Sequence, residues 1–383
     1  MRFEFATTTH IIFGAGTIRD VAPLAAGMGK RAFVVTGQSL ERAGPLLKDI
    51  NKQGIEYTTF CVTGEPTTTI AKKGVEKARR AKSNLVIGIG GGSALDTGKV
   101  IAAMLTNIGE LEDYLEVVGH GKPLIQNPVP YIAIPTTAGT GAEVTRNAVL
   151  GVPEHHVKVS LRSPLLPPRL AVVDPVLTYS MPSSITASTG LDALTQLMEA
   201  YVSNKANPLT DGICREGLKR AGRSLRQAYE DGSNCTARED MALASLFSGL
   251  ALANAKLGAV HGLAGPLGGM ISAPHGTICA RLLSYVMEAN VQALQNRAPG
   301  SSALARYGEI AQLLTGNTAK TFDGIEWVRN ICLALKVLPL SEFGLKEPDF
   351  STVVAKSQKS SSMKGNPIPL TDDELMTILK KSQ

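Results

Sequence analysis

The stretch "NLVIGIGGGSALDTGK", residues 84 to 99, is an apolar run that ends in glycines and continues into a helical pattern. A short, unbroken apolar run bounded by glycine is typical of a strand that is buried on both faces of a parallel sheet. Glycines directly after such a strand let backbone N–H groups approach a phosphate at the positive end of the next helix. The stretch therefore predicts a strand, a phosphate-binding turn and a helix.

Similar short apolar runs recur through the first half of the chain. "RAFVVTG" (31–37), "YIAIPTT" (131–137) and "LAVVDP" (170–175) indicate further buried strands, and "TTIAKKGVEKARRA" (68–81) indicates a helix between two of them. Alternation of strands and helices predicts an α/β layer with right-handed crossovers. A second glycine pair, "GAGT" (14–17), lacks the spacing of a dinucleotide fingerprint and is interpreted as a hairpin turn.

The pattern changes after about Met181, where strand-like runs disappear and helical periodicity takes over. The expected helices cover 183–204, 210–231, 237–258, 301–316, 324–338 and 372–382. A chain of 383 residues is longer than one hydrophobic core usually serves. We therefore predict an α/β domain over residues 1–180 and an all-helical domain over residues 181–383.

Composition narrows the class of protein. Apolar residues make up 44% of the chain, and its net charge of +6 comes from dispersed lysines and arginines beside a single tryptophan, which predicts no nucleic-acid partner. No apolar run is long enough for a membrane span, and the N-terminus has no signal-peptide pattern. The cysteines form no CxxC pair, which favours reduced thiols and a cytoplasmic protein. They are Cys61, Cys214, Cys235, Cys279 and Cys332.

A second turn rich in small and hydroxyl residues, "PTTAGTGAEVT" (135–145), follows another expected strand. Its hydroxyls can hydrogen-bond to a phosphate or to a nicotinamide amide, although such a turn can also be purely structural. Two such turns at the carboxyl ends of parallel strands mark the crevice where α/β sheets bind nucleotides. Together they predict a dinucleotide site.

Two further segments supply candidate metal ligands. In "TGLDALTQLMEA" (189–200), Asp192 and Gln196 lie four residues apart and share one face of the expected helix. In "GAVHGLAGPLGGMISAPHG" (258–276), His261 and His275 stand among small residues. A carboxylate and two imidazoles suit Zn²⁺ or Fe²⁺, whereas a lone histidine is more often a core residue.

Taken together, the signatures "GGGSALDTGK", "PTTAGTGAEVT", "DPVLT", "GLDALTQLMEAY" and "GAVHGLAGPLGGMISAPHG" make the chain resemble the iron-containing (group III) alcohol dehydrogenases. The resemblance implies an N-terminal dinucleotide-binding domain, an all-helical C-terminal domain and a divalent metal in the cleft between them. It also implies hydride transfer between NAD(P) and a small alcohol or aldehyde, with the metal polarising the carbonyl oxygen. A homodimer is one expectation for the assembly.

Carried over position by position, the metal ligands of this family fall on Asp192, His261 and His275, while Gln196 replaces a third histidine. An amide oxygen is a weaker donor than an imidazole nitrogen, so we expect a retained Fe or Zn site of reduced affinity. Gly265 replaces another family histidine near the nicotinamide. A water molecule or a cofactor ribose hydroxyl would then have to carry the proton.

The dinucleotide is expected to meet residues of the two glycine- and threonine-rich turns and of the loop after the first expected strand. Gly37 stands where the family often has an aspartate that would repel a 2′-phosphate, so we predict that NADP(H) is preferred over NAD(H) or at least well tolerated. Arg42 would supply positive charge for that phosphate. The predicted cofactor contacts are Gly37, Ser39, Gly91, Gly92, Ser93, Asp96, Thr136, Thr137, Thr140 and Lys158.

Three alternatives stay open. A metal-independent enzyme resembling maleylacetate reductase would bind a carboxylate substrate, with Arg146 and Arg162 as candidate contacts. A lyase resembling 3-dehydroquinate synthase shares the two-domain fold, but the complete "PTTAGTG…EVT" signature argues against it. The loss of two histidines would also fit a catalytically inactive binding protein.

Overall fold

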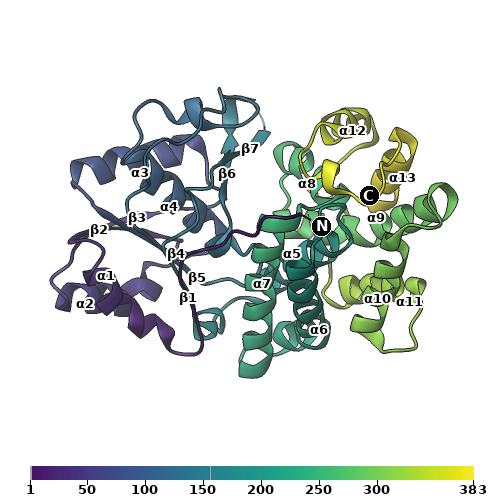
Figure 1. Ribbon diagram of the computed structural model, residues 1–383, viewed down its shortest axis with the longest axis horizontal. Coiled ribbons are helices and arrows are strands. Elements are labelled where there is room, and N and C mark those ends of the chain that lie inside the picture. Colours follow the sequence, from purple (N-terminus) through teal and green to yellow (C-terminus); the bar gives the residue numbers. More distant parts are fainter. Residues whose placement is uncertain (1, 156) are drawn as a thin grey trace. The chain divides into compact units, whose positions relative to one another are not determined.

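The computed structural model describes residues 2–155 and 157–383, which form two compact units (Figure 1). The α/β unit comprises Ala6–Thr137 and Gly141–Tyr179. The helical unit is mainly Ser180–Gln383, and it also includes Ala138–Thr140 and the N-terminal residues up to Phe5. The main change of unit thus falls between residues 179 and 180.

The α/β unit is built on a six-stranded sheet in which every pairing is parallel, with the order β1-β8-β5-β4-β2-β3. Strand β4 is buried at every position, as its unbroken apolar sequence predicts. The strands are β1 (Ile11–Phe13), β2 (Arg31–Thr36), β3 (Glu56–Cys61), β4 (Leu85–Gly90), β5 (Tyr131–Pro135) and β8 (Leu170–Val173). The predicted fold class is therefore confirmed for this half.

Helices cover both faces of this sheet (Figure 1). Alternate residues of β2 point to opposite faces, so Phe33 and Val35 pack with α3 and α4, and Val34 packs with α1 and α2. The helices are α1 (Val21–Ala26), α2 (Gly44–Lys52), α3 (Thr68–Arg80) and α4 (Gly92–Met104). The two hydrophobic layers hold β4 and its glycine turn in a fixed place.

The interpretation of "GAGT" as a hairpin turn is wrong. Strand β1, which precedes it, pairs in parallel with β8, and the turn leads into the short helix η1 (Thr17–Asp20). Gly16 has a φ of 82°, a conformation that favours glycine. The carboxylate of Asp174 accepts hydrogen bonds from the N–H groups of Gly16 and Ile18, at 3.0 and 3.2 Å, and so fixes the turn.

Four strands have no counterpart in the sequence prediction: β1, which is described above, and β3, β6 and β7. Strand β3 lies at the edge of the sheet and is half-exposed, so it lacks an apolar run. Strands β6 (Asn147–Val152) and β7 (Val157–Arg162) form a separate antiparallel ribbon. Buried and half-buried residues alternate along β6, which is the pattern of a strand with only one face in the core.

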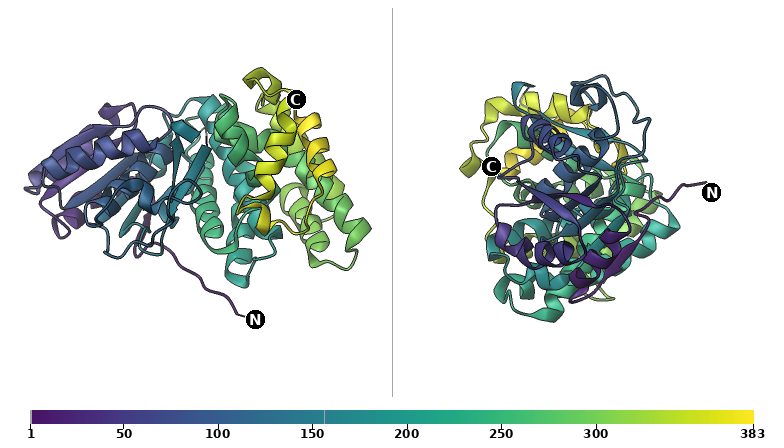
Figure 2. Two further views of the ribbon diagram at one scale, coloured as in Figure 1. Left: turned by 90° about the horizontal axis from the view of Figure 1, so that it is seen from above. Right: turned by 90° about the vertical axis from the view of Figure 1, so that its left-hand side faces the viewer.

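The helical unit contains nine α-helices within the described residues (Figure 2). They are α5 (Ser183–Val202), α6 (Pro208–Glu230), α7 (Cys235–Ala255), α8 (Ala259–Met270), α9 (His275–Arg297), α10 (Ser302–Thr315), α11 (Thr321–Ala334), α12 (Phe350–Gln358) and α13 (Asp372–Ser382). Of the described helices, none is by itself long and apolar enough to span a membrane, although the bent pair α7 and α8 passes that test of length and composition. The predicted all-helical C-terminal domain is confirmed.

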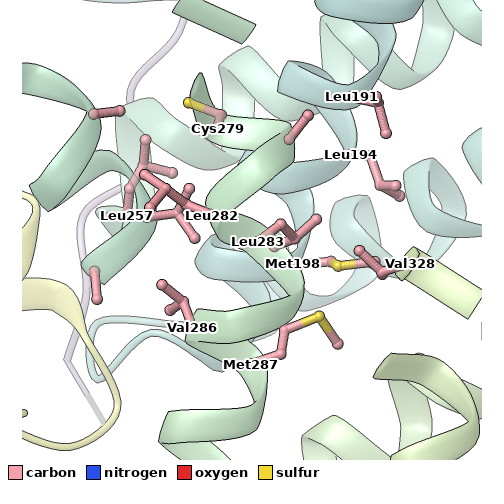
Figure 3. Close-up of a cluster of buried hydrophobic side chains, with 14 of the residues drawn as sticks. Leu191, Leu194, Met198, Leu257, Cys279, Leu282, Leu283, Val286, Met287 and Val328 are labelled. Carbon is pink, nitrogen blue, oxygen red and sulfur yellow. The ribbon is translucent and has the colours of Figure 1, made fainter. Parts of the chain in front are cut away.

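Helices α5 and α9 pack at the centre of this unit. Figure 3 shows Leu191 and Leu194 of α5 and Leu283 of α9 in one cluster of buried hydrophobic side chains. At the first turn of α9, a Cβ atom on Gly276 would lie 2.0 Å from the carbonyl oxygen of Ser188. Glycine is therefore required there, and its close contact sets the start of α9 against α5.

Candidate active site

Four side chains with metal-binding atoms converge where α5, α8 and α9 meet. Their donor atoms all lie within 4.8 Å of one another, and they belong to Asp192, His261, His275 and Cys279. The Nε2 atom of His261 is 3.4 Å from Asp192 Oδ1 and 3.7 Å from Cys279 Sγ. The Nε2 atom of His275 is 3.9 Å and 3.6 Å from the same two atoms. The fold thus brings together Asp192, His261 and His275, although α6, α7 and α8 lie between Asp192 and His275 in the sequence.

His261 is held in place by a carboxylate that the sequence interpretation missed. The Oε2 atom of Glu199 lies 2.6 Å from Nδ1 of His261, and its Oε1 atom accepts a hydrogen bond from the backbone N–H of Val260. With Nδ1–H donating to Glu199, Nε2 points between Asp192 and Cys279, where its lone pair would be available to a metal. A carboxylate behind an imidazole is the usual arrangement around a metal-binding histidine.

Two buried polar atoms in this region have no hydrogen-bond partner within the described structure. They are Oδ1 of Asp192 and Oε1 of Gln196, one helical turn apart on α5. Leaving such an atom without a partner costs about 1–3 kcal/mol, and more for a charged group. A cation would satisfy the carboxylate oxygen of Asp192, so this donor set fits a divalent metal.

The electrostatics favour the metal-binding form of the two acidic groups. Burial raises the pKa of the Cys279 thiol, but His261 and His275 lower it by more, and the net pKa is below its ordinary value. The pKa of Asp192 is also lowered, because the same two histidines outweigh the effect of burial. Conversely, burial lowers the pKa of His261, but the neighbouring acidic groups raise it well above its ordinary value. The acidic groups and the two imidazoles thus favour each other's charged forms.

The glycine turn after β4 has the form expected of a phosphate site. Gly91 is the N-cap residue, and α4 begins at Gly92. The N–H groups of the first helical turn have no intrahelical acceptors, so those of Gly92 and Ser93 are available to an anion. A Cβ atom on Gly90 would lie 2.7 Å from Cβ of Ala94, which is why glycine is required before the turn.

The predicted cofactor residues of three neighbouring strands meet at one edge of the sheet. Strand β4 lies between β2 and β5, with Ile89 opposite Thr36 and Gly90 opposite Pro135. The residues that follow these strands are Gly37, Gly91, Thr136 and Thr137, and a Cβ atom on Gly91 would lie 3.3 Å from Cγ2 of Thr137. These are the carboxyl ends of parallel strands, where open α/β sheets bind dinucleotides.

Two further predicted cofactor residues, Asp96 and Lys158, form contacts within the α/β unit. Asp96 accepts hydrogen bonds from Lys99 and from the N–H of Val149, at 3.2 and 3.0 Å, and links α4 to β6. Lys158 forms an ion pair of 3.1 Å with Glu65. Their contacts with the cofactor stay predictions, as do those of two residues on loops. Ser39 is exposed at the start of η2 (Leu40–Ala43), and Thr140 belongs to the helical unit.

Both glycines that replace family side chains face open space. A Cβ atom on Gly37 or on Gly265 would meet no other atom within 4 Å. Gly265 lies one helical turn after His261 on α8. Room for a side chain therefore remains at each position.

Comparisons with known proteins agree with this architecture. Residues 8–175 match the family described as iron-containing alcohol dehydrogenase, and residues 186–383 match the C-terminal part of the Fe-containing alcohol dehydrogenase family. The chain is 35% identical to alcohol dehydrogenase 4 of Saccharomyces cerevisiae (strain YJM789), over 97% of this chain and 96% of that protein. It is 34% identical to 1,3-propanediol dehydrogenase of Klebsiella pneumoniae, over 99% and 98% of the two chains.

A solved structure of a 1,3-propanediol oxidoreductase superposes with a TM-score of 0.92 at 33% identity and covers 100% of both chains. The two family matches and these full-length relatives all concern dehydrogenases of alcohols. The chain belongs to the iron-containing alcohol dehydrogenase family and is an oxidoreductase that acts on CH–OH groups.

Proposed function

We propose that the chain reduces small aldehydes with NADPH, and oxidises the corresponding alcohols with NADP⁺, at a divalent metal bound by Asp192, His261 and His275. The observation that carries this proposal is the convergence of these donors, together with the buried Asp192 oxygen that lacks a hydrogen-bond partner. A metal there would act as a Lewis acid toward the substrate oxygen. The name of one relative, 1,3-propanediol dehydrogenase, supports a short-chain alcohol as substrate.

Other residues of the chain orient a metal ligand and bind the cofactor. Glu199 orients His261, and the N–H groups of Gly92 and Ser93 bind the pyrophosphate at the start of α4. Gly37 leaves room for the 2′-phosphate of NADP(H). Because Gly265 has no proton to give, the proton for the substrate oxygen would have to come from a water molecule or from the cofactor ribose hydroxyl.

The direct test is a panel of short-chain aldehydes and alcohols assayed by NADPH consumption or formation, with the His261→Ala variant beside the wild type. We expect turnover by the wild type and a loss of at least about a hundredfold in the variant, equal to about 2.7 kcal/mol of transition-state stabilisation. The Cys235→Ser variant alters an exposed thiol and should keep full activity. No turnover of any panel member by the wild type would contradict the proposal.

A further inference from the structure

We infer that Cys279 is a protein ligand of the metal and takes the place of the histidine that Gln196 replaces, which makes the site a thiolate site that selects Zn²⁺. This inference rests on the proposed function only in assuming that a divalent metal binds at Asp192, His261 and His275. It adds a residue that the family ligand set does not contain.

The position of Cys279 follows from helix geometry. His275 is the first residue of α9, and Cys279 lies four residues later, so both side chains project from the same face. The Cys279 side chain is buried, and it reaches the imidazole of His261 across the interface of α8 and α9 and that of His275 on its own helix. A side chain from α9 can therefore supply the ligand that α5 no longer provides.

Three of the four donor separations agree with a tetrahedral arrangement of protein ligands, to which a substrate oxygen would add as a fifth ligand. With Zn–N and Zn–O bonds of about 2.0–2.1 Å and a Zn–S bond of about 2.3 Å, neighbouring N and O ligands lie roughly 3.3 Å apart and N and S ligands roughly 3.6 Å apart. His261 Nε2 is 3.4 Å from Asp192 Oδ1 and 3.7 Å from Cys279 Sγ. For His275 Nε2 the same two distances are 3.9 and 3.6 Å. The nitrogen–sulfur separations thus match those of a zinc site.

The ligand atoms of Cys279 and Gln196 differ in charge and in softness. A thiolate is anionic and soft, whereas the amide oxygen of Gln196 is neutral and hard. Two anionic ligands with two neutral imidazoles balance the charge of a divalent ion, which stabilises the ion in a buried site. The general order of divalent-metal affinities already places Zn²⁺ above Fe²⁺, and a soft thiolate ligand increases this preference. The ligand set therefore predicts that the enzyme binds zinc, although its family is named for iron.

Cobalt substitution of the full-length protein tests the inference without an activity assay. Co²⁺ bound by a thiolate absorbs in the near ultraviolet by charge transfer from sulfur, whereas Co²⁺ bound by nitrogen and oxygen alone lacks this band. Metal-depleted wild type titrated with Co²⁺ should develop the band, and so should the Cys235→Ser control. In Cys279→Ser the band should be absent, and Zn²⁺ affinity, measured by competition with a chromogenic chelator, should fall by at least about tenfold.

The double variant Gln196→His/Cys279→Ser should regain Zn²⁺ affinity without regaining the band, because it restores the family ligand set. Stoichiometric Co²⁺ binding by the wild type without the band would overturn the role of Cys279 and leave the proposed function intact. Unchanged Zn²⁺ affinity in Cys279→Ser would do the same. Failure of the wild type to bind any divalent ion would overturn both the role of Cys279 and the proposed metal-dependent function.

Discussion

We expect residue 37 to decide which dinucleotide the α/β unit accepts. The position follows β2, next to the glycine turn after β4, and an added Cβ atom would meet no other atom of the described residues within 4 Å. We expect Gly37→Asp to fold normally and to shift the ratio of kcat/KM for NADPH over NADH toward NADH by about tenfold or more. A carboxylate there adds one charge-assisted hydrogen bond to a ribose hydroxyl, worth about 1.5–3 kcal/mol, and repels a 2′-phosphate.

The matched control is Gly212→Asp, which adds the same charge at an equally open, exposed glycine of the helical unit. Its cofactor ratio should equal that of the wild type. A wild type that is already strongly selective for NADH would contradict the role assigned to Gly37.

The ligands should differ in how much each contributes to metal binding. Replacing an imidazole removes a strong donor, whereas replacing an amide oxygen removes a weak one. We expect His275→Ala to lose bound metal on dialysis and Gln196→Ala to retain most of it, as measured by elemental analysis. Gln196→His should bind metal more tightly than the wild type. Equal metal loss in His275→Ala and Gln196→Ala would show that the ranking is wrong.

The sequence allowed part of this site to be predicted at the residue scale. Asp192, His261 and His275 were identifiable because the resemblance assigns them roles, and the structure places them together. Cys279 and Glu199 were missed because no family ligand falls on them. Their helical spacing was nevertheless visible: Cys279 is four residues after His275, and Glu199 is seven residues after Asp192.

At the scale of elements, the short helix η4 (Ala142–Val144) carries a buried acid that should make stability depend on pH. Glu143 is 2% exposed, and burial raises its pKa to about 7. Below its unfolded pKa near 4.5 both states are protonated. Between pH 4.5 and pH 7 the unfolded chain releases this proton while the folded chain keeps it. The free energy of unfolding therefore falls as the pH rises, by up to about 3 kcal/mol.

We therefore expect Glu143→Gln to remove this part of the pH dependence. Its free energy of unfolding, measured with urea and circular dichroism, should exceed that of the wild type by more at pH 8 than at pH 5. Glu154→Gln, at an exposed position of the same unit, should track the wild type at both pH values. A constant difference between Glu143→Gln and the wild type across this range would refute the assignment.

Elements with unbroken apolar runs or clear helical periodicity were predictable, and the others were not. Strands β2, β4, β5 and β8 are buried throughout or nearly so, which leaves a distinct signal in the sequence. The ribbon of β6 and β7 is buried on one face only, and α8 is so rich in glycine that its helical pattern is weak. The ends of α8 and α9 are set by tertiary contacts, such as that of Gly276 with Ser188, which no local pattern reveals.

At the scale of the whole molecule, the two-unit architecture followed from one change of pattern near residue 180. The short buried strands before residue 180 pack as a sheet between helices, whereas the amphipathic helices after it pack against one another. The structure accordingly has separate hydrophobic cores for the two units. The assignment of Ala138–Thr140 to the helical unit was not predictable, because these residues continue directly from β5 in the sequence. The contact of Thr140 with the cofactor, which the "PTTAGTGAEVT" turn predicts, stays a prediction.

The central claim is that a divalent metal held by Asp192, His261 and His275 is required for hydride transfer. The measurement is the metal content and aldehyde-dependent NADPH oxidation of one preparation, purified without chelators, then treated with dipicolinate, and then reloaded with Zn²⁺. We predict close to one metal ion per chain at the start, loss of metal and of activity in step, and recovery of both with unchanged circular dichroism. Full aldehyde reduction by the metal-depleted protein would contradict the account and would favour a metal-independent enzyme that resembles maleylacetate reductase.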